Sequence, residues 1–192
     1  ATVFHENGHK ASEGVFIDQL KDGTWNYYSN TDQLIAIENY NKGLRTGEWK
    51  TFSNETGLLL EETNYLNDKK NGVHKTYYFD GTVSLEENYL EGKLNGKCAT
   101  YYPKTGVATS GEYLKGVRTG SWNYHDANGK IRSTVEYKNG VAFNTFVYLY
   151  TNGAAQKINQ NVIAYFLKSG EKSVAVLTKG NKIPIDESLD EV

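Results

Sequence analysis

Four glutamates recur along the chain and are the residues best suited to acid–base chemistry: Glu38, Glu87, Glu112 and Glu136. Two carboxylates on either side of a sugar ring are the usual machinery of glycoside cleavage. A catalytic residue is usually singular, however, whereas a residue that returns in every copy of a repeat is usually architectural. Because these glutamates recur beside a tyrosine, we expect cross-strand pairing with lysines or capping of backbone groups instead.

The histidines and the single cysteine offer little further chemistry. His5 and His9 are four residues apart, which suits a metal only on a helix, and no helix is expected there. His74 and Cys98 take the position that holds tryptophan in other copies of the repeat, so we expect both to be buried and structural. His125 falls in a row of aromatic residues. The sequence therefore predicts no catalytic residue, no metal, no cofactor and no enzyme.

Aromatic residues at one repeat position form a candidate binding ladder: Tyr28, Phe52, Tyr77, Tyr101 and His125. Neighbouring side chains of a strand point to opposite faces, so this ladder faces away from Trp25 and its equivalents. If exposed, it would bind an extended peptide, a glycan or another sheet. If covered, it would only shield the second face of a single-layer sheet. Both interpretations remain open on the sequence alone.

A second set of aromatic residues is expected to hold the elements together. These residues recur at two other positions of the same repeat and form a structural ladder: Trp25, Trp49, Trp122, Tyr40, Tyr65, Tyr89, Tyr113 and Tyr137. Each copy opens with a glycine, and these glycines are 24 or 25 residues apart: Gly23, Gly47, Gly72, Gly96 and Gly120. Internal repetition of this kind indicates stacked copies that bury one continuous core.

Each copy is expected to contain two strands joined by tight turns. The strands are short and aromatic or alternate polar with apolar residues, as in 33–40 and 130–137. Asn-Gly and Asp-Gly dipeptides, the strongest short-range hairpin signal, are predicted to mark the turns. They are Asn7-Gly8, Asp22-Gly23, Asn71-Gly72, Asp80-Gly81, Asn95-Gly96, Asn128-Gly129, Asn139-Gly140 and Asn152-Gly153. The predicted fold is all-β, an elongated antiparallel meander in a single twisted sheet with a β cap.

The repeat divides the chain into three predicted parts. Residues 1–19 carry a degenerate N-terminal copy, and residues 20–153 carry the tandem copies. Residues 154–192 lose the register and contain apolar runs at 162–167, 174–177 and 183–185. We expect two or three strands there that cap the sheet and protect its last edge, followed by an acidic tail.

Composition limits the classes of partner that we expect and indicates where in the cell the protein acts. The net charge of −2 gives no electrostatic footprint for nucleic acid. No apolar run is long enough for a transmembrane segment. The sequence has no methionine, even at position 1. Removal of an export signal would explain this and favours a periplasmic or cell-surface protein, although an artificial N-terminus would explain it as well.

The repeat resembles the variant MORN repeat, in the form found in bacterial proteins labelled YwqK-type antitoxin components. The residues that carry the resemblance are Gly47-Glu-Trp49, Tyr77-Tyr78, Asn128-Gly129, Glu87-x-Tyr89 and Gly116–Gly120. It covers about residues 20–153, and His74 and Cys98 depart from its tryptophan position. The resemblance implies a repetitive antiparallel sheet and a non-enzymatic interaction role, with an antitoxin or immunity function suggested by the family label only.

Three hypotheses for function follow. The first is a repeat protein that binds another protein along the aromatic ladder, with no deep pocket. The second is a carbohydrate-binding or glycan-cleaving surface protein, suggested by the tyrosine and tryptophan content. The third is a purely structural spacer in a larger assembly.

Overall fold

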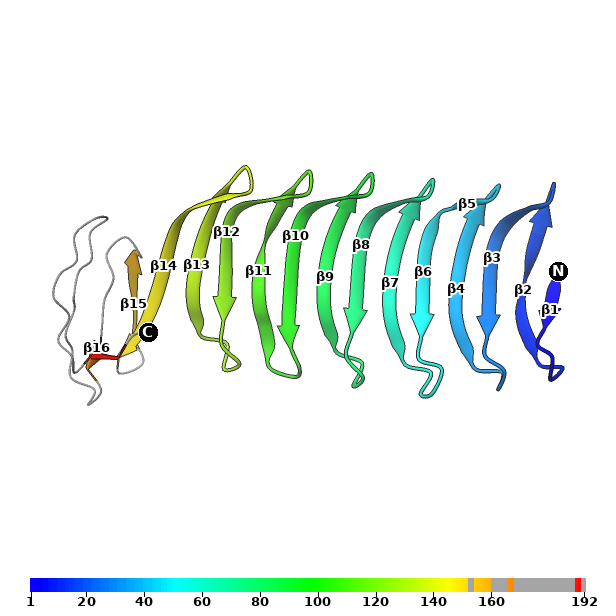
Figure 1. Ribbon diagram of the computed structural model, residues 1–192, viewed down its shortest axis with the longest axis horizontal. Coiled ribbons are helices and arrows are strands. Elements are labelled where there is room, and N and C mark those ends of the chain that lie inside the picture. Colours follow the sequence, from blue (N-terminus) through cyan, green and yellow to red (C-terminus); the bar gives the residue numbers. More distant parts are fainter. Residues whose placement is uncertain (152–153, 160–165, 168–188, 191–192) are drawn as a thin grey trace.

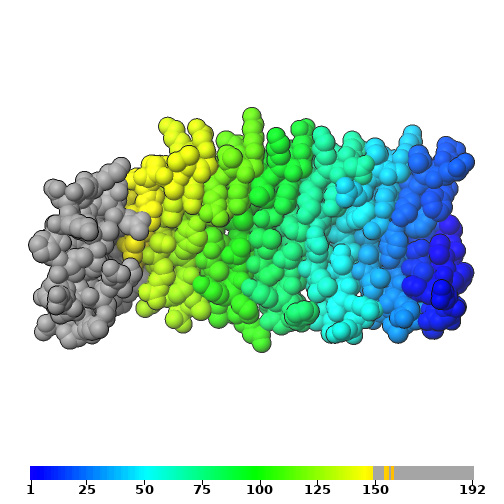
Figure 2. Space-filling view, viewed as in Figure 1, coloured from blue at the N-terminus to red at the C-terminus, as the bar shows by residue number. Residues whose placement is uncertain are grey.

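The computed structural model describes residues 1–151, 154–159, 166–167 and 189–190. In this part of the chain, fifteen strands form one antiparallel sheet in which β1 to β15 follow each other in sequence order, except that the short β5 pairs only with β4 (Figure 1). The strands of this sheet lie side by side along one axis (Figure 1), and the sequence colours follow each other in the same order over the space-filling surface (Figure 2). The prediction of an all-β antiparallel meander is therefore confirmed.

The strands of this sheet are β1 (Thr2–Phe4), β2 (Lys10–Ile17), β3 (Leu20–Tyr28), β4 (Leu34–Asn41), β5 (Leu44–Arg45), β6 (Gly47–Phe52), β7 (Leu59–Leu66), β8 (Lys69–Tyr77), β9 (Val83–Leu90), β10 (Lys93–Tyr102), β11 (Gly106–Leu114), β12 (Val117–His125), β13 (Ile131–Lys138), β14 (Val141–Thr151) and β15 (Ala154–Asn159). Two further short strands, β16 (Phe166–Leu167) and β17 (Leu189–Asp190), pair with each other. No helix long and apolar enough to cross a membrane occurs among the described residues. The predicted cap strands at 174–177 and 183–185 lie outside those residues.

Two-residue turns join the strands at one edge of the sheet, the upper edge in Figure 1. Both central residues of each turn have positive φ, the combination of a type I′ turn, whose twist matches that of the flanking strands. These turns are Asp18–Gln19, Lys42–Gly43, Asn67–Asp68, Glu91–Gly92, Lys115–Gly116 and Asn139–Gly140. Among them, only the last is one of the predicted Asn-Gly turns.

Three of the predicted turns are wrong. Asp22-Gly23, Asn71-Gly72 and Asn95-Gly96 lie inside β3, β8 and β10, not in hairpin turns. The three glycines have φ of 69°, 99° and 104° and sit where the pairing register with the preceding strand shifts. A glycine at positive φ in an interrupted ladder is the mark of a β-bulge, so each repeat glycine bends its strand and does not reverse it.

The acidic or amide residue before these glycines also has a different task. Asp22 Oδ1 accepts a hydrogen bond of 2.8 Å from the backbone N–H of Lys42, one repeat later. Asn95 Oδ1 accepts an equivalent bond of 3.2 Å from the N–H of Lys115. Each side chain therefore holds the next tight turn in place. The dipeptide recurs because it couples a bend to a neighbouring turn.

Longer loops connect the strands at the opposite edge, and the predicted turns at Asn7-Gly8, Asp80-Gly81 and Asn128-Gly129 lie in them. Side chains at this edge bind the backbone of the next repeat. The Tyr78 hydroxyl donates to the Tyr101 carbonyl at 2.5 Å, and the Tyr102 hydroxyl donates to the His125 carbonyl at 3.0 Å. Successive repeats are thus joined at both edges as well as through the strand ladders. Asn152-Gly153 lies outside the described residues.

One face of the sheet, here called the Trp face, carries the structural ladder. Tryptophan and tyrosine rings from successive strands touch edge to face, with centroids 5.2 Å apart for Tyr40–Trp49 and 5.0 Å for Tyr113–Trp122. The Trp122 indole N–H donates to the Glu112 carbonyl at 3.2 Å, beside the shifted register of β11 and β12. The tryptophan therefore fills the bulge and satisfies a carbonyl that the bulge removes from the ladder.

Candidate binding face of the sheet

The opposite face, here called the ladder face, carries Tyr28, Phe52, Tyr77, Tyr101 and His125, all of them half-buried. Each repeat contributes one such ring and two strands, so neighbouring rings are about 9.6 Å apart along the sheet. The choice between a binding ladder and a shield for the second face therefore stays a prediction, because each ring is neither fully exposed nor fully covered.

The hydroxyls of two ladder tyrosines, Tyr28 and Tyr77, are held by glutamates of the preceding strand. The Tyr28 hydroxyl donates to Glu13 at 2.6 Å, and Lys10 pairs with the same carboxylate at 2.8 Å. The hydrogen bonds from Lys10 and Tyr28 lower the pKa of Glu13. The carboxylate therefore stays ionised and fixes the ring from its hydroxyl end.

The same arrangement recurs two repeats later. The Tyr77 hydroxyl donates to Glu62 at 2.6 Å, and Lys50 lies 3.3 Å from that carboxylate. Burial and this hydrogen bond raise the pKa of Tyr77. Phe52, which has no hydroxyl, has Ile37 at the position equivalent to Glu62. A hydroxyl in the ladder thus goes with a carboxylate fifteen residues earlier, and a plain ring goes with an aliphatic residue.

The four recurring glutamates do not share a face. Glu38 is paired in register with Trp25 and accepts a 2.7 Å hydrogen bond from the Tyr40 hydroxyl, so it belongs to the Trp face. Glu87 is paired with His74 and accepts from Tyr89 on the same face. Burial and these carboxylates raise the pKa of Tyr40 and of Tyr89 to about 12.

Glu112 and Glu136, which directly precede their tyrosines, point to the ladder face because side chains alternate along a strand. Glu136 accepts a 3.0 Å hydrogen bond from Asn144 there. Glutamates of the two sets are thus separated by the sheet and cannot act as one carboxylate pair.

The histidines are dispersed among separate partners. The His5 Nε2 atom bonds the Tyr28 carbonyl at 2.9 Å, and the His9 ring lies 2.5 Å from Asp32. His74 is buried on the Trp face, where its Nδ1 lies 2.8 Å from the Thr63 hydroxyl and burial lowers its pKa. No group of three or more metal-ligating side chains occurs within the described residues.

Cys98 occupies the tryptophan slot of its repeat and is buried there. Burial raises the pKa of its thiol to about 11, which keeps the sulfur protonated and unreactive at neutral pH. It is paired in register with Glu87 on one side and Gly111 on the other. This environment is that of a small structural side chain.

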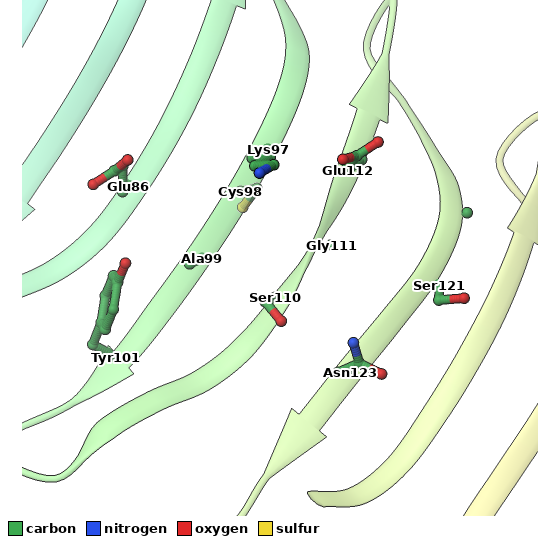
Figure 3. A pocket seen from close by; sticks show the side chains of 11 residues that line it. Glu86, Lys97, Cys98, Ala99, Tyr101, Ser110, Gly111, Glu112, Ser121 and Asn123 are labelled. Carbon is green, nitrogen blue, oxygen red and sulfur yellow. The ribbon is translucent and has the colours of Figure 1, made fainter. Parts of the chain in front are cut away.

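An open hollow of about 540 Å³ interrupts the ladder face over β9 to β12 (Figure 3). Ala99, Ser110 and Ser121 line it with short side chains, while Glu86 and Tyr101 stand at one side. The Asn123 amide also faces it, and its oxygen accepts a 2.8 Å hydrogen bond from Thr134. A second open depression, of about 630 Å³, is lined in part by Tyr28 and Phe52. Ladder residues therefore border both hollows.

Two segments of the chain, residues 70–91 and 118–139, match the family model of the MORN repeat variant. Each MORN-variant segment spans two strands and the longer loop between them, β8–β9 in the first and β12–β13 in the second. No curated protein matches the chain. A solved structure described as "Crystal Structure of TarM" is similar with a TM-score of 0.35 at 17% identity, over 56% of this chain and 20% of that one. The chain thus spans about a fifth of the length of that structure.

The MORN-variant segments also begin with a cation that sequence reasoning missed. Lys70 and Arg118 open the two segments, and Lys21 and Arg45 take the same position in earlier repeats. These side chains lie over the rings of the Trp face, with the Arg118 guanidinium carbon 4.2 Å from the Trp122 ring centre. The signal was present in the sequence as a cation two residues before four of the five repeat glycines. Leu94 interrupts it, which makes the period harder to see.

Proposed function

We propose that this protein is a non-enzymatic binding scaffold that holds another protein along its ladder face. The observation that carries the proposal is the row of half-buried rings at a fixed pitch on one side of a single-layer sheet. A rigid row of large amphipathic rings provides contact area at low cost in conformational entropy. The two open hollows bordered by ladder residues add places where side chains of a partner could insert.

Several features support binding over catalysis. The recurring carboxylates are divided between the two faces, and the cysteine is buried with a raised pKa. The hydroxyls of Tyr28 and Tyr77 in the ladder are fixed by structural glutamates. An antitoxin or immunity role would be one form of this scaffold function, in which the bound protein is a toxin. The family resemblance is the only support for that narrower form.

The proposal is tested by replacing two rings of the ladder together, Tyr77→Ala and Tyr101→Ala. A bait of the intact protein is used to capture its partner from the host that produces it, and the double variant is compared with the unchanged chain. We expect the double variant to lose the partner while its thermal unfolding stays cooperative.

The matched control is Phe79→Ala, which removes a ring that is 80% exposed in the loop between β8 and β9 and lies outside the ladder. This control should retain the partner. Retention of the partner by the double variant would contradict the proposal, and so would capture of a glycan in place of a protein.

A further inference from the structure

A row of alternating charges crosses the ladder face beside the aromatic ladder. Lys50 Nζ lies 3.3 Å from Glu62, and Lys75 Nζ lies 3.4 Å from Glu86 on the next pair of strands. Register pairing places Lys50 opposite Glu62 and Lys75 opposite Glu86. The order across the sheet is therefore cation, anion, cation, anion, from Lys50 to Glu86.

The next position in this row should hold a cation and holds Ala99. Ala99 is paired in register with Glu86, as Lys75 is on the other side of the same glutamate. Beyond it the row continues with Ser110 and Asn123. The short side chains leave the hollow of about 540 Å³ at the place where a lysine stem would otherwise lie.

Groups around the hollow complement a positive charge. Glu86 and Glu112 line it from the strands on either side of Ala99, and Tyr101 contributes an aromatic ring (Figure 3). The Tyr101 hydroxyl makes no hydrogen bond with any residue that the structure describes, unlike those of Tyr28 and Tyr77. Lys97 also lines the hollow, and it is paired in register with Glu112, so its charge balances that carboxylate and leaves Glu86 and the Tyr101 ring as the groups that complement a cation.

We propose that the hollow receives a lysine or arginine side chain of the bound protein partner. This inference rests on the proposed scaffold function and names the contact that gives it specificity. The incoming cation takes the place that Lys50 and Lys75 occupy in the preceding repeats, next to Glu86. It also lies over the Tyr101 ring, as Lys10 lies over the Tyr28 ring at 5.4 Å.

The chain itself shows why a cation fits better than a neutral sugar. On this face, the position equivalent to Ala99 is filled by an ammonium group in the two preceding repeats, and both are paired with carboxylates. A sugar would leave the alternation of charges incomplete, since Glu86 would gain no second cation. Saccharide binding is therefore an outcome that would contradict the proposal.

The first test needs no partner. The blocked tripeptide acetyl-Gly-Lys-Gly-amide, its arginine equivalent and its norleucine equivalent are titrated into the full chain, and backbone amide shifts are followed by NMR. We expect the two cationic peptides to shift the amides of Ala99, Ser110 and Ser121 at millimolar concentration and the norleucine peptide to leave them unchanged. Added salt should weaken the effect, because the contact is an accessible ion pair.

Variants locate the contact. Ala99→Lys should fill the hollow from within, complete the charge row and abolish peptide binding without lowering the melting temperature. Glu86→Gln should weaken peptide binding about two- to fivefold, the effect of one exposed ion pair. Asn26→Lys is the matched control. Asn26 is the equivalent of Ala99 three repeats earlier, so this variant adds the same charge to the same row at a position remote from the hollow. This control should bind the peptides as the unchanged chain does.

The outcomes separate this inference from the scaffold function. Equal shifts with the norleucine peptide, shifts with neutral saccharides alone, or unaltered binding by Ala99→Lys would each overturn the cation site. If a captured partner is released by the ladder double variant but not by Ala99→Lys, the scaffold stands and the cation site falls. If the peptides bind as expected but the ladder double variant keeps its partner, the scaffold proposal falls instead.

Discussion

How far a tryptophan of the Trp face is buried depends on one residue of the preceding strand. Trp25 and Trp122 are each 2% exposed, and a glycine lies beneath each ring: Gly14 and Gly111. A Cβ atom built on Gly111 would lie 2.3 Å from Trp122 Cδ2, so no other residue fits without displacing the indole. Trp49 has a glutamate at the corresponding position and is only half-buried. Gly14 and Gly111 do not have φ in the left-handed region, so the backbone conformation does not require glycine there. Glycine is needed at these positions because it leaves space for the indole ring.

We therefore expect Gly111→Ala to lower the free energy of unfolding by about 1–3 kcal/mol, the usual cost of overpacking a fitted core. Chemical denaturation of the single variant measures this cost. In a Trp122→Cys background, which reproduces the small side chain of the neighbouring repeat, the same substitution should cost much less. An equal cost in both backgrounds would mean that the glycine serves the backbone and not the ring.

His74 makes the stability of the chain depend on pH. Burial, assisted by the nearby charge of Lys70, lowers its pKa below the ordinary value of 6.5, so the folded protein prefers the neutral ring. Below pH 6.5 the unfolded chain takes up a proton that the folded chain resists, and the folded state loses stability as the pH falls from that value toward the lowered pKa. Above pH 6.5 both states hold a neutral ring and this contribution is constant.

Denaturant melts at a series of pH values should thus show a loss of stability between about pH 7 and about pH 5 that His74→Asn removes. Asparagine cannot titrate, yet it retains a group that can accept from the Thr63 hydroxyl. A pH dependence that survives in this variant would assign the effect to other groups, such as the carboxylates that bind tyrosine hydroxyls.

At the scale of the elements, each repeat joins the next through its bend, its tight turn and its cation. The backbone N–H of Gly116 donates to the Leu94 carbonyl at 2.7 Å, and that of Gly140 donates to the Arg118 carbonyl at 3.0 Å. The residue whose carbonyl accepts this bond, two positions before the repeat glycine, is a cation that lies over the Trp face in four repeats. Arg118 also donates to the Tyr137 hydroxyl at 3.1 Å. In the repeat of Leu94 the cation is missing.

Exchanging the two residues tests what the cation contributes. Arg118→Leu should reduce the free energy of unfolding by about 0.5–2 kcal/mol, the range for a cation over an aromatic ring as it becomes desolvated. Leu94→Arg should add a smaller amount, because Cys98 replaces tryptophan beneath it and leaves Tyr113 as the partner ring. Thermal melts at low and high salt measure both changes. No loss in Arg118→Leu would indicate that the aliphatic stem alone covers the ring.

Within the described residues, β1 to β15 form a one-dimensional array in which each strand pairs with the strands next to it in the sheet, and the short β5 pairs with β4 alone. Stability in such an array is a sum over repeats and the interfaces between them, so damage should remain near its origin. Trp25→Ala should accordingly raise hydrogen exchange in β2 to β4 more than in β11 to β13. An equal increase along the sheet would show that it opens as a single unit. The ladder face extends over the same array, which lets a partner contact several repeats.

Sequence period and alternation together predicted much of this arrangement. A glycine every 24 or 25 residues, with aromatic residues at fixed distances after it, determined that the fold is a meander and which rings lie on each face. Turn positions were predicted poorly, since Asn-Gly reads the same in a hairpin and in a bulge. The cation row was missed because its role depends on a ring in the next strand. A short stretch of sequence shows neither whether an Asn-Gly pair forms a hairpin or a bulge nor which ring a cation contacts.

By itself, the sequence determined the repeat, the strand-rich class and the separation of Trp25 from Tyr28, because local geometry enforces alternation along a strand. Only the tertiary structure decided which glycines bend strands, which glutamates lie on opposite faces, and where a short side chain leaves a hollow beside Glu86. Those features depend on the register between neighbouring strands. Each bulge adds residues to one strand and so shifts that register, and the local sequence does not show where these extra residues are.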